Sequence, residues 1–149
     1  AFVGLGAPYW DTEARGTIVG MSRGTNRAQL VRAALESIAL QSRDLIDAME
    51  ADFGKPVCEL KADGGAAANS FLMQFQADML GKAIVLPEVM EITALGAAYL
   101  AGLEVSYWDS LKDIALNWRI RRRFEPGSSE QERKDALDRW HKAVSAARF

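Results

Sequence analysis

Two adjacent glycines, Gly64 and Gly65, stand between a short strand pattern and a helix pattern. Residues 57–62 alternate apolar and polar side chains, as a half-buried strand does, and lead to Asp63. The helix behind the glycines has an apolar stripe at helical spacing, formed by Phe71, Leu72, Phe75, Met79 and Leu80. Strands that alternate with helices pack into layers, with the helices covering a sheet. This order of elements predicts an α/β domain.

Strand and helix patterns alternate on both sides of this unit. Further strands are predicted at residues 15–22 and 83–86. Between the first strand and the glycine turn, Thr25 or Asn26 can cap an amphipathic helix of about 25 residues, which ends near residues 54–56. The repeated alternation supports the same fold class.

The last third of the chain differs from the rest. A short helix is predicted over residues 109–118 and an extended basic segment over 119–124. Residues 129–132 have the form of a capping box and begin a final helix. We therefore expect an α/β domain over residues 1–126 and a C-terminal helical tail over 127–149 that packs on or beside it.

The glycine turn is the best candidate for a ligand site. Because they lack Cβ atoms, Gly64 and Gly65 let a ligand approach the main chain, and the helix N-terminus behind them attracts phosphate. Asn69, expected about one turn into the helix, can reach back to such a ligand. The small residues 93–98, in a third helix predicted over 93–103, suit close packing and clearance for a flat ligand ring equally well. Neither of the two common glycine-rich phosphate patterns occurs here, so spacing alone leaves phosphate binding and a purely structural turn both open.

The composition excludes several classes of function. The chain has 18 Lys and Arg against 20 Asp and Glu, a net charge of −2, so no global field attracts nucleic acid or an acidic membrane surface. No apolar run approaches about 18 residues, the length that would indicate a membrane helix. The single cysteine, Cys58, lies in an apolar stretch where we expect a buried, inert thiol, which fits a reducing cytoplasm.

Other polar residues carry weaker signals. The only histidine, His141, has no Cys, Asp or Glu around it at metal-ligand spacing, so we expect a surface histidine and no metal site. The basic segment 119–123 lacks interleaved aromatic residues and precedes an acidic stretch, which favours a solvated or ion-paired surface.

Three segments share a more specific pattern. The first is Gly4-Leu5-Gly6-Ala7-Pro8-Tyr9-Trp10-Asp11, followed by Ala14-Arg15-Gly16. The second is Asp63-Gly64-Gly65 with Asn69, Phe71 and Gln74-Phe75-Gln76, and the third is Thr93-Ala94-Leu95-Gly96-Ala97-Ala98-Tyr99-Leu100-Ala101. In this order and spacing they strongly resemble the glycerol kinases of the FGGY carbohydrate-kinase family over about residues 1–126. The form of the first segment is more similar to glycerol kinases than to the pentulose and gluconate kinases of that family.

The resemblance implies a partial actin-like ATPase, or ribonuclease H-like, domain that binds an adenine nucleotide, ATP or ADP with Mg²⁺. It implies nucleotide contacts by Gly65 and Asn69, with Gly64 and Ala66 as neighbours in the same turn. The kinase it implies transfers the γ-phosphoryl group of ATP to glycerol, giving glycerol 3-phosphate, and is a cytoplasmic homo-oligomer.

The catalytic residues of that family have no counterpart in this chain. Its phosphate loop, its glycerol-binding Arg, Glu and Tyr and its catalytic Asp would all lie upstream, and the chain opens at Ala1 without an initiator Met. We therefore expect the C-terminal part of a longer kinase, without a catalytic residue of its own, which needs the N-terminal part as partner. A kinase of another polyol or of a pentulose, and a non-catalytic module that docks through residues 119–149, are the alternatives.

Overall fold

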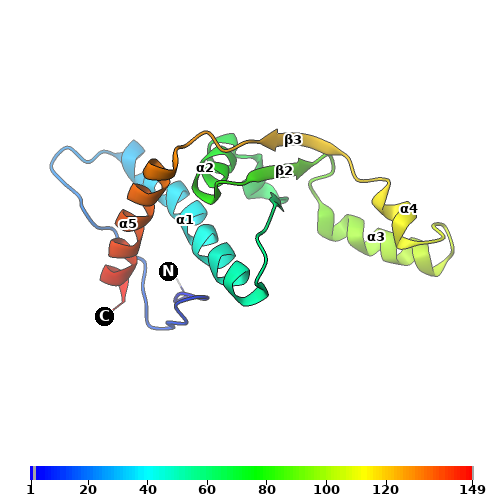
Figure 1. Cartoon of the computed structure of the whole chain (residues 1–149), viewed down its shortest axis with the longest axis horizontal. Helices are drawn as coiled ribbons and strands as arrows, with labels where there is room; N and C mark the ends of the chain where they lie inside the picture. The colour runs from blue at the N-terminus through cyan, green and yellow to red at the C-terminus, as the bar shows by residue number, and fades with distance from the viewer. Residues whose placement is uncertain (2, 149) are drawn as a thin grey trace.

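The structure, a computed structural model, describes residue 1 and residues 3–148. Its elements are α1 (Arg27–Phe53), β1 (Glu59–Lys61), the 3-10 turn η1 (Gly65–Ala68), α2 (Ser70–Leu80), β2 (Ala83–Pro87), α3 (Ile92–Glu104), α4 (Leu111–Ala115), β3 (Ile120–Phe124) and α5 (Glu130–Ala147). Figure 1 shows an elongated molecule with α5 and both chain ends on one side, α3 and α4 on the other, and the sheet between them. The mixture of helices and a small sheet agrees with the predicted α/β class.

Three strands form one sheet in the order β1-β2-β3. β1 runs parallel to β2, with Leu60 opposite Ile84, whereas β3 runs antiparallel to β2, with Arg123 opposite Val85. The chain passes from β1 to β2 through η1 and α2, because two parallel strands need a crossover connection. Every residue of β2 is buried, so this strand is the centre of the sheet.

The main hydrophobic core surrounds α2. This helix packs against α1 and against the strands β2 and β3. The buried residues of the core come from all of these elements and from η1: Ala39, Ile46, Ala67, Leu72, Met73, Ala77, Leu80, Ile84, Leu86 and Phe124. Because α2 has partners in both layers, its first residue and the turn before it have a defined position in the fold.

The helix ends follow the capping signals of the sequence. Asn26 caps α1 in a capping box with Gln29, and Ser129 caps α5 in the same way with Glu132. Gly81 ends α2 in the left-handed conformation, with φ 64°. The predicted capping box of the final helix is therefore confirmed, as is the cap of the long helix at Asn26.

The strand predicted at residues 15–22 is wrong. This segment has no regular secondary structure, and Ile18, Val19 and Met21 are exposed. A strand needs a neighbour that pairs with its N–H and C=O groups, and no strand of the described chain pairs with this segment. Alternating apolar residues alone could not supply that partner.

The expected burial of Cys58 is also wrong. Its thiol is exposed, in the loop between α1 and β1. The preceding residue, Val57, packs partly buried against the core. Neighbouring side chains of an extended segment point in opposite directions, so covering Val57 leaves Cys58 outside.

Two helices carry apolar side chains that the described structure leaves exposed. On α1 they recur at steps of seven and four residues, which places them in one stripe: Val31, Ile38, Leu45, Met49 and Phe53. On α3, an apolar helix, Gly102 is the only buried residue. Exposed stripes of this kind are typical of surfaces that pack against another part of a protein. Even so, none of the helices described here has the length and apolarity needed to cross a membrane.

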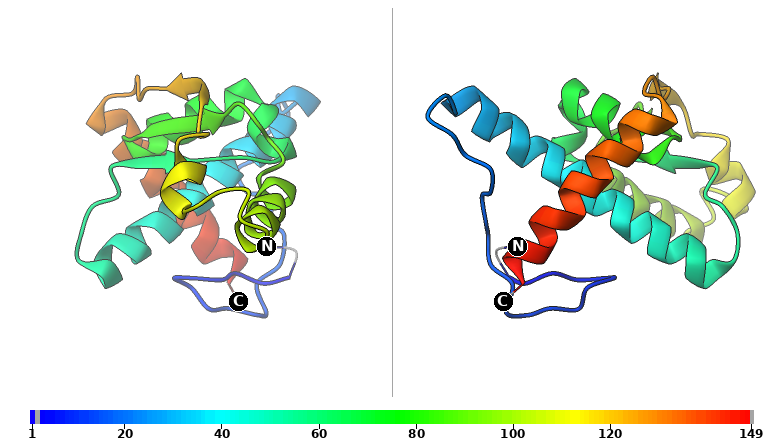
Figure 2. Two further views of the ribbon diagram at one scale, coloured as in Figure 1. Left: turned by 90° about the vertical axis from the view of Figure 1, so that its right-hand side faces the viewer. Right: turned by 60° about the vertical axis from the view of Figure 1, so that its left-hand side comes forward.

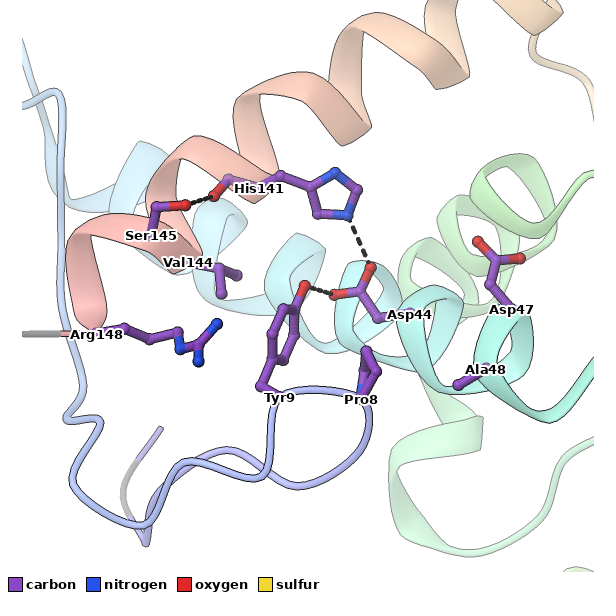
Figure 3. A pocket seen from close by; sticks show the side chains of 9 residues that line it. All are labelled: Pro8, Tyr9, Asp44, Asp47, Ala48, His141, Val144, Ser145 and Arg148. Atoms are coloured by element: carbon purple, nitrogen blue, oxygen red, sulfur yellow. Dashed lines mark hydrogen bonds and ion pairs between the residues drawn. The ribbon is translucent and has the colours of Figure 1, made fainter. Parts of the chain in front are cut away.

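A buried carboxylate, Asp44, links α1 to α5 through polar contacts. Asp44 on α1 is only 6% exposed, and its Oδ2 accepts hydrogen bonds from the Tyr9 hydroxyl at 2.6 Å and from Trp140 Nε1 at 2.5 Å. His141 Nε2 lies 3.0 Å from Asp44 Oδ1, within hydrogen-bonding distance (Figure 3). His141 is half exposed, as expected of a surface histidine, and it also pairs with Asp44.

Replacing this carboxylate should destabilise the fold. We expect Asp44→Ala to lower the free energy of unfolding by about 3 kcal/mol, because the Tyr9 hydroxyl and the Trp140 N–H lose their acceptor. Urea denaturation measures the effect. Asp52→Ala, at an exposed position of the same helix, is the control and should change the stability by less than about 0.5 kcal/mol. Equal losses in the two variants would contradict this role of Asp44.

Candidate functional site

The glycine turn lies at the carboxyl ends of the two parallel strands. Beyond β1, the Ala62 N–H donates to the Val85 carbonyl at 3.0 Å. The Gly64 N–H then donates at 3.2 Å to the carbonyl of Met90, in the loop that follows β2. Gly64 has φ 82° and ψ 179°, a conformation that is accessible essentially to glycine alone. Ligands of parallel sheets bind outside the carboxyl ends of the strands, so the turn lies where a site is expected.

The main chain of the turn is open to approach. In η1 only Ala67 points into the core, whereas Gly65, Ala66 and Ala68 are exposed. A Cβ atom added to Gly64 or Gly65 would meet no heavy atom of the described structure within 4 Å beyond the adjacent residues. The turn therefore presents a backbone surface that a ligand can touch directly.

Asn69 has a different place from the one expected. It is the N-cap of α2, and its Oδ1 accepts a hydrogen bond from the Leu72 N–H at 3.2 Å. The expectation of a residue one turn inside the helix was wrong because the 3-10 turn η1 comes between the glycines and α2. The Asn69 side chain is exposed, and its amide nitrogen makes no hydrogen bond to the described residues. That nitrogen remains a free donor beside the glycines.

The start of α2 is electropositive. Its first turn contains no acidic residue, and its N-terminal N–H groups carry a partial positive charge. The Arg122 guanidinium adds to this charge, because its Nη1 donates to Ser70 Oγ at 2.7 Å. Sequence alone placed Arg122 in a solvated or ion-paired segment, since the two residues lie 52 positions apart and no local pattern links them. Its neighbour Arg123 is ion-paired as predicted, with Glu59 and Glu125.

An apolar pocket opens beside the Met90 loop. Its walls come from the end of β2, from α3 and from the chain between α4 and β3, and include Val89, Leu95, Gly96, Tyr99 and Trp118. Lys61, the last residue of β1, lies over the Trp118 ring with Nζ 4.5 Å from its centroid, which links the pocket to the strand that leads into the glycine turn. Gly96 leaves open space at the pocket wall. Close packing within the described structure therefore does not explain Gly96.

A second pocket surrounds the Asp44 cluster, between the N-terminal loop, α1 and α5 (Figure 3). Its polar groups are engaged with one another or with neighbouring residues: Arg148 Nε, for example, lies 3.0 Å from Asp11 Oδ2. Burial raises the pKa of the Tyr9 phenol and the hydrogen bond to Asp44 adds to the rise, so Tyr9 remains a protonated donor. No buried side-chain nitrogen or oxygen in the described residues lacks a partner, which favours a structural role for this cluster. The described residues also contain no group of three or more metal-ligating side chains.

The sequence matches a known family over most of its length. A family model described as the C-terminal domain of the FGGY family of carbohydrate kinases matches residues 1–105. The chain belongs to the FGGY family of carbohydrate kinases. The glycine turn, Asn69 and the whole of α3 lie within the matched range.

Members of the family from several bacteria are similar over nearly the whole chain. A glycerol kinase of Deinococcus radiodurans is 58% identical over 148 residues, which is 99% of this chain and 30% of the relative. A glycerol kinase of Aromatoleum aromaticum is 57% identical with the same two coverages. A glycerol kinase of Caldanaerobacter subterraneus is 58% identical over 147 residues, again 99% of this chain and 30% of the relative. The chain thus spans about 30% of the length of the curated FGGY relatives it matches.

Solved structures of the family have the same arrangement of elements. The crystal structure of Plasmodium falciparum glycerol kinase with ADP aligns with a TM-score of 0.89 at 40% identity, over 100% of this chain and 30% of that one. A xylulose kinase from Rhodospirillum rubrum aligns with a TM-score of 0.68 at 27% identity, over 89% of this chain and 26% of that one. The fold is therefore that of the sugar kinases of this family.

The two roles of Asn69 can be separated by substitution. We expect Asn69→Ala to lower the free energy of unfolding by about 1 kcal/mol, because the Leu72 N–H loses its cap, and Asn69→Ser, which keeps a capping oxygen, to change it by less than about 0.3 kcal/mol. Urea denaturation of the two variants checks this. Equal losses would show that Asn69 does not act as the cap.

Proposed function

We propose that this chain is the C-terminal, nucleotide-binding part of a glycerol kinase, which phosphorylates glycerol with ATP to give glycerol 3-phosphate. The observation that carries the proposal is an identity of 57–58% to proteins named glycerol kinase over 99% of the chain. The neighbour with the TM-score of 0.89 is a glycerol kinase with ADP, which supports an adenine nucleotide as the ligand.

Within this part, we propose that Gly64, Gly65, Ala66 and Asn69 hold the nucleotide. The bare backbone of the turn, with open space where side chains would stand, fits a ligand that approaches the main chain closely. The free amide nitrogen of Asn69 provides a donor for a nucleotide acceptor group, while its oxygen keeps the helix cap. The electropositive start of α2 suits the charge of the phosphates. The bound nucleotide supplies the phosphoryl group, and these residues orient it.

The rest of the enzyme must provide the chemistry. Phosphoryl transfer depends on positioning the two reactants and neutralising charge on the transferred group, with Mg²⁺ as the usual cation. The described residues offer no cluster that could hold a metal by itself, so we propose that Mg²⁺ and the acceptor are held mainly by the part of the kinase that this chain does not include.

We also propose that residues 1–126 are part of an actin-like ATPase, or ribonuclease H-like, domain and that 127–149 form a peripheral helix of a cytoplasmic, homo-oligomeric enzyme. The exposed apolar stripe of α1 and the apolar helix α3, in which only Gly102 is buried in the described structure, support a larger domain, because such surfaces are covered in a folded protein. β1 is an edge strand of the described sheet, where further strands of such a domain can pair. The contact of α5 with α1 and α2 supports a tail that packs on the domain.

The two alternatives have less support. Xylulose kinases share the fold, but the one from Rhodospirillum rubrum is 27% identical to this chain, against 58% for a bacterial glycerol kinase. A docking module built on the basic segment is disfavoured because Arg122 and Arg123 are both engaged within the chain. Glycerol therefore remains the proposed acceptor.

A charge in the turn should block the nucleotide. In the complete kinase, we expect Gly65→Asp to weaken ATP binding by at least about tenfold, because its carboxylate occupies the open space and repels phosphate. Gly65→Ala is the matched control, and its methyl group should have an effect of less than about threefold. Calorimetric titration with ATP measures both. If Gly65→Asp bound ATP like the unaltered kinase, this site would be wrong.

The isolated chain should be inactive. The resemblance to glycerol kinases implies that the catalytic Asp and the glycerol-binding residues lie outside this chain, so we expect no glycerol-dependent release of ADP by the purified chain. A coupled ADP assay tests this, with the complete kinase as positive control. Glycerol-dependent release of ADP by the chain alone would contradict the proposal that the catalytic residues lie in another part of the kinase.

A further inference from the structure

The second half of β3 and the segment that follows it lie along one face of α2. We call residues 122–128 the strap. At one end, Arg122 Nη1 donates to Ser70 Oγ at 2.7 Å. In the middle, Gln74 Nε2 donates to the Glu125 carbonyl at 2.8 Å. At the other end, Asp78 accepts hydrogen bonds from the Gly127 N–H at 2.7 Å, through Oδ1, and from the Ser128 hydroxyl at 2.9 Å, through its carbonyl.

The three positions on the helix, 70, 74 and 78, are four residues apart and therefore share one face of α2. The strap thus contacts the helix once in every turn, from its first residue to its third turn. Hydrophobic packing presses α2 onto α1 and the sheet, but such packing is not directional. The hydrogen bonds to the strap are directional, and each one restricts sliding and rotation of the helix.

Arg122 is the strap residue that reaches the start of the helix. Its guanidinium lies 4.3 Å from the centroid of the Phe124 ring, and Phe124 is a core residue that is 4% exposed. The guanidinium therefore contacts both the ring of the buried residue Phe124 and the Ser70 hydroxyl. The next residue, Arg123, pairs instead with Glu59 and Glu125.

Ser70 is the first residue of α2 and directly follows Asn69, the cap that ends the glycine turn. A cation beside a helix N-terminus is unfavourable for the helix alone. The Arg122 contact is thus poorly explained by helix stability. An effect on Asn69, which directly precedes Ser70, explains the contact better.

We propose that Arg122 is a positioning residue for nucleotide binding: by holding Ser70, it sets the orientation of Asn69 and of the turn 64–66. This inference rests on the proposed nucleotide site. Arg122 acts through Ser70 and needs no contact with the nucleotide itself.

The test uses the complete kinase with four variants and steady-state kinetics. Arg122→Gln and Ser70→Ala should each raise KM for ATP by about threefold to tenfold, while kcat and KM for glycerol change by less than about twofold. In the double variant the two effects should not add, because both remove one contact. Arg122→Lys, which keeps a charged donor, should restore part of the affinity for ATP.

Two controls separate positioning from stability. Arg121→Gln removes a neighbouring exposed cation for which the described structure has no hydrogen bond or ion pair, and it should leave KM for ATP unchanged. Asp78→Ala breaks the far end of the strap and should lower Tm without raising KM for ATP.

Two outcomes would overturn the proposal. In one, Arg122→Gln changes KM for ATP no more than Arg121→Gln does. In the other, Arg122→Gln lowers the yield of active enzyme and Tm as Asp78→Ala does, with KM unchanged. Failure of the nucleotide site itself is a distinct result, because Gly65→Asp would then also leave ATP binding intact.

Discussion

The burial of α2 between α1 and the sheet is the constraint on which the rest of this structure depends. Leu72, Met73 and Ala77 lie in one core with residues of α1, β2 and β3, so the helix cannot move without opening that core. Because α2 begins immediately after η1, its packing also determines where the glycine turn lies. The exposed turn is the surface of a rigid unit, which is the condition for holding a ligand in a defined orientation.

Polar contacts fix the orientation of the helices that hydrophobic packing brings together. The strap fixes α2 along one face, and the Asp44 cluster fixes α5 and the N-terminal loop to α1 (Figure 2 shows α5 crossing α1). Asp44 is buried with three polar neighbours, so its charge is compensated and its geometry defined. The two sets of contacts differ in what they join: the strap lies along α2, which begins beside the proposed nucleotide turn, whereas the Asp44 cluster joins α1, α5 and the N-terminal loop.

Features encoded by a few neighbouring residues could be predicted from sequence, and features that need a distant partner could not. The caps at Asn26 and Ser129 depend on side chains three positions apart, and both are present as expected. The false strand at 15–22 had the right local pattern but lacks a pairing strand in the described chain. Asn69 was expected one turn inside the helix but is its N-cap, because η1, which no simple periodicity indicates, comes first. The Arg122 contact joins residues 52 positions apart, so only the folded chain reveals it.

Hydrogen–deuterium exchange of the complete kinase, with and without ADP, can show whether the glycine turn holds the nucleotide. We expect ADP to slow exchange at the amides of residues 64–72, because the nucleotide covers the turn and rigidifies the start of α2. Exchange in α5 should stay the same, since that helix lies away from the turn (Figure 1). Protection by ADP elsewhere in the kinase, with residues 64–72 unchanged, would contradict the account.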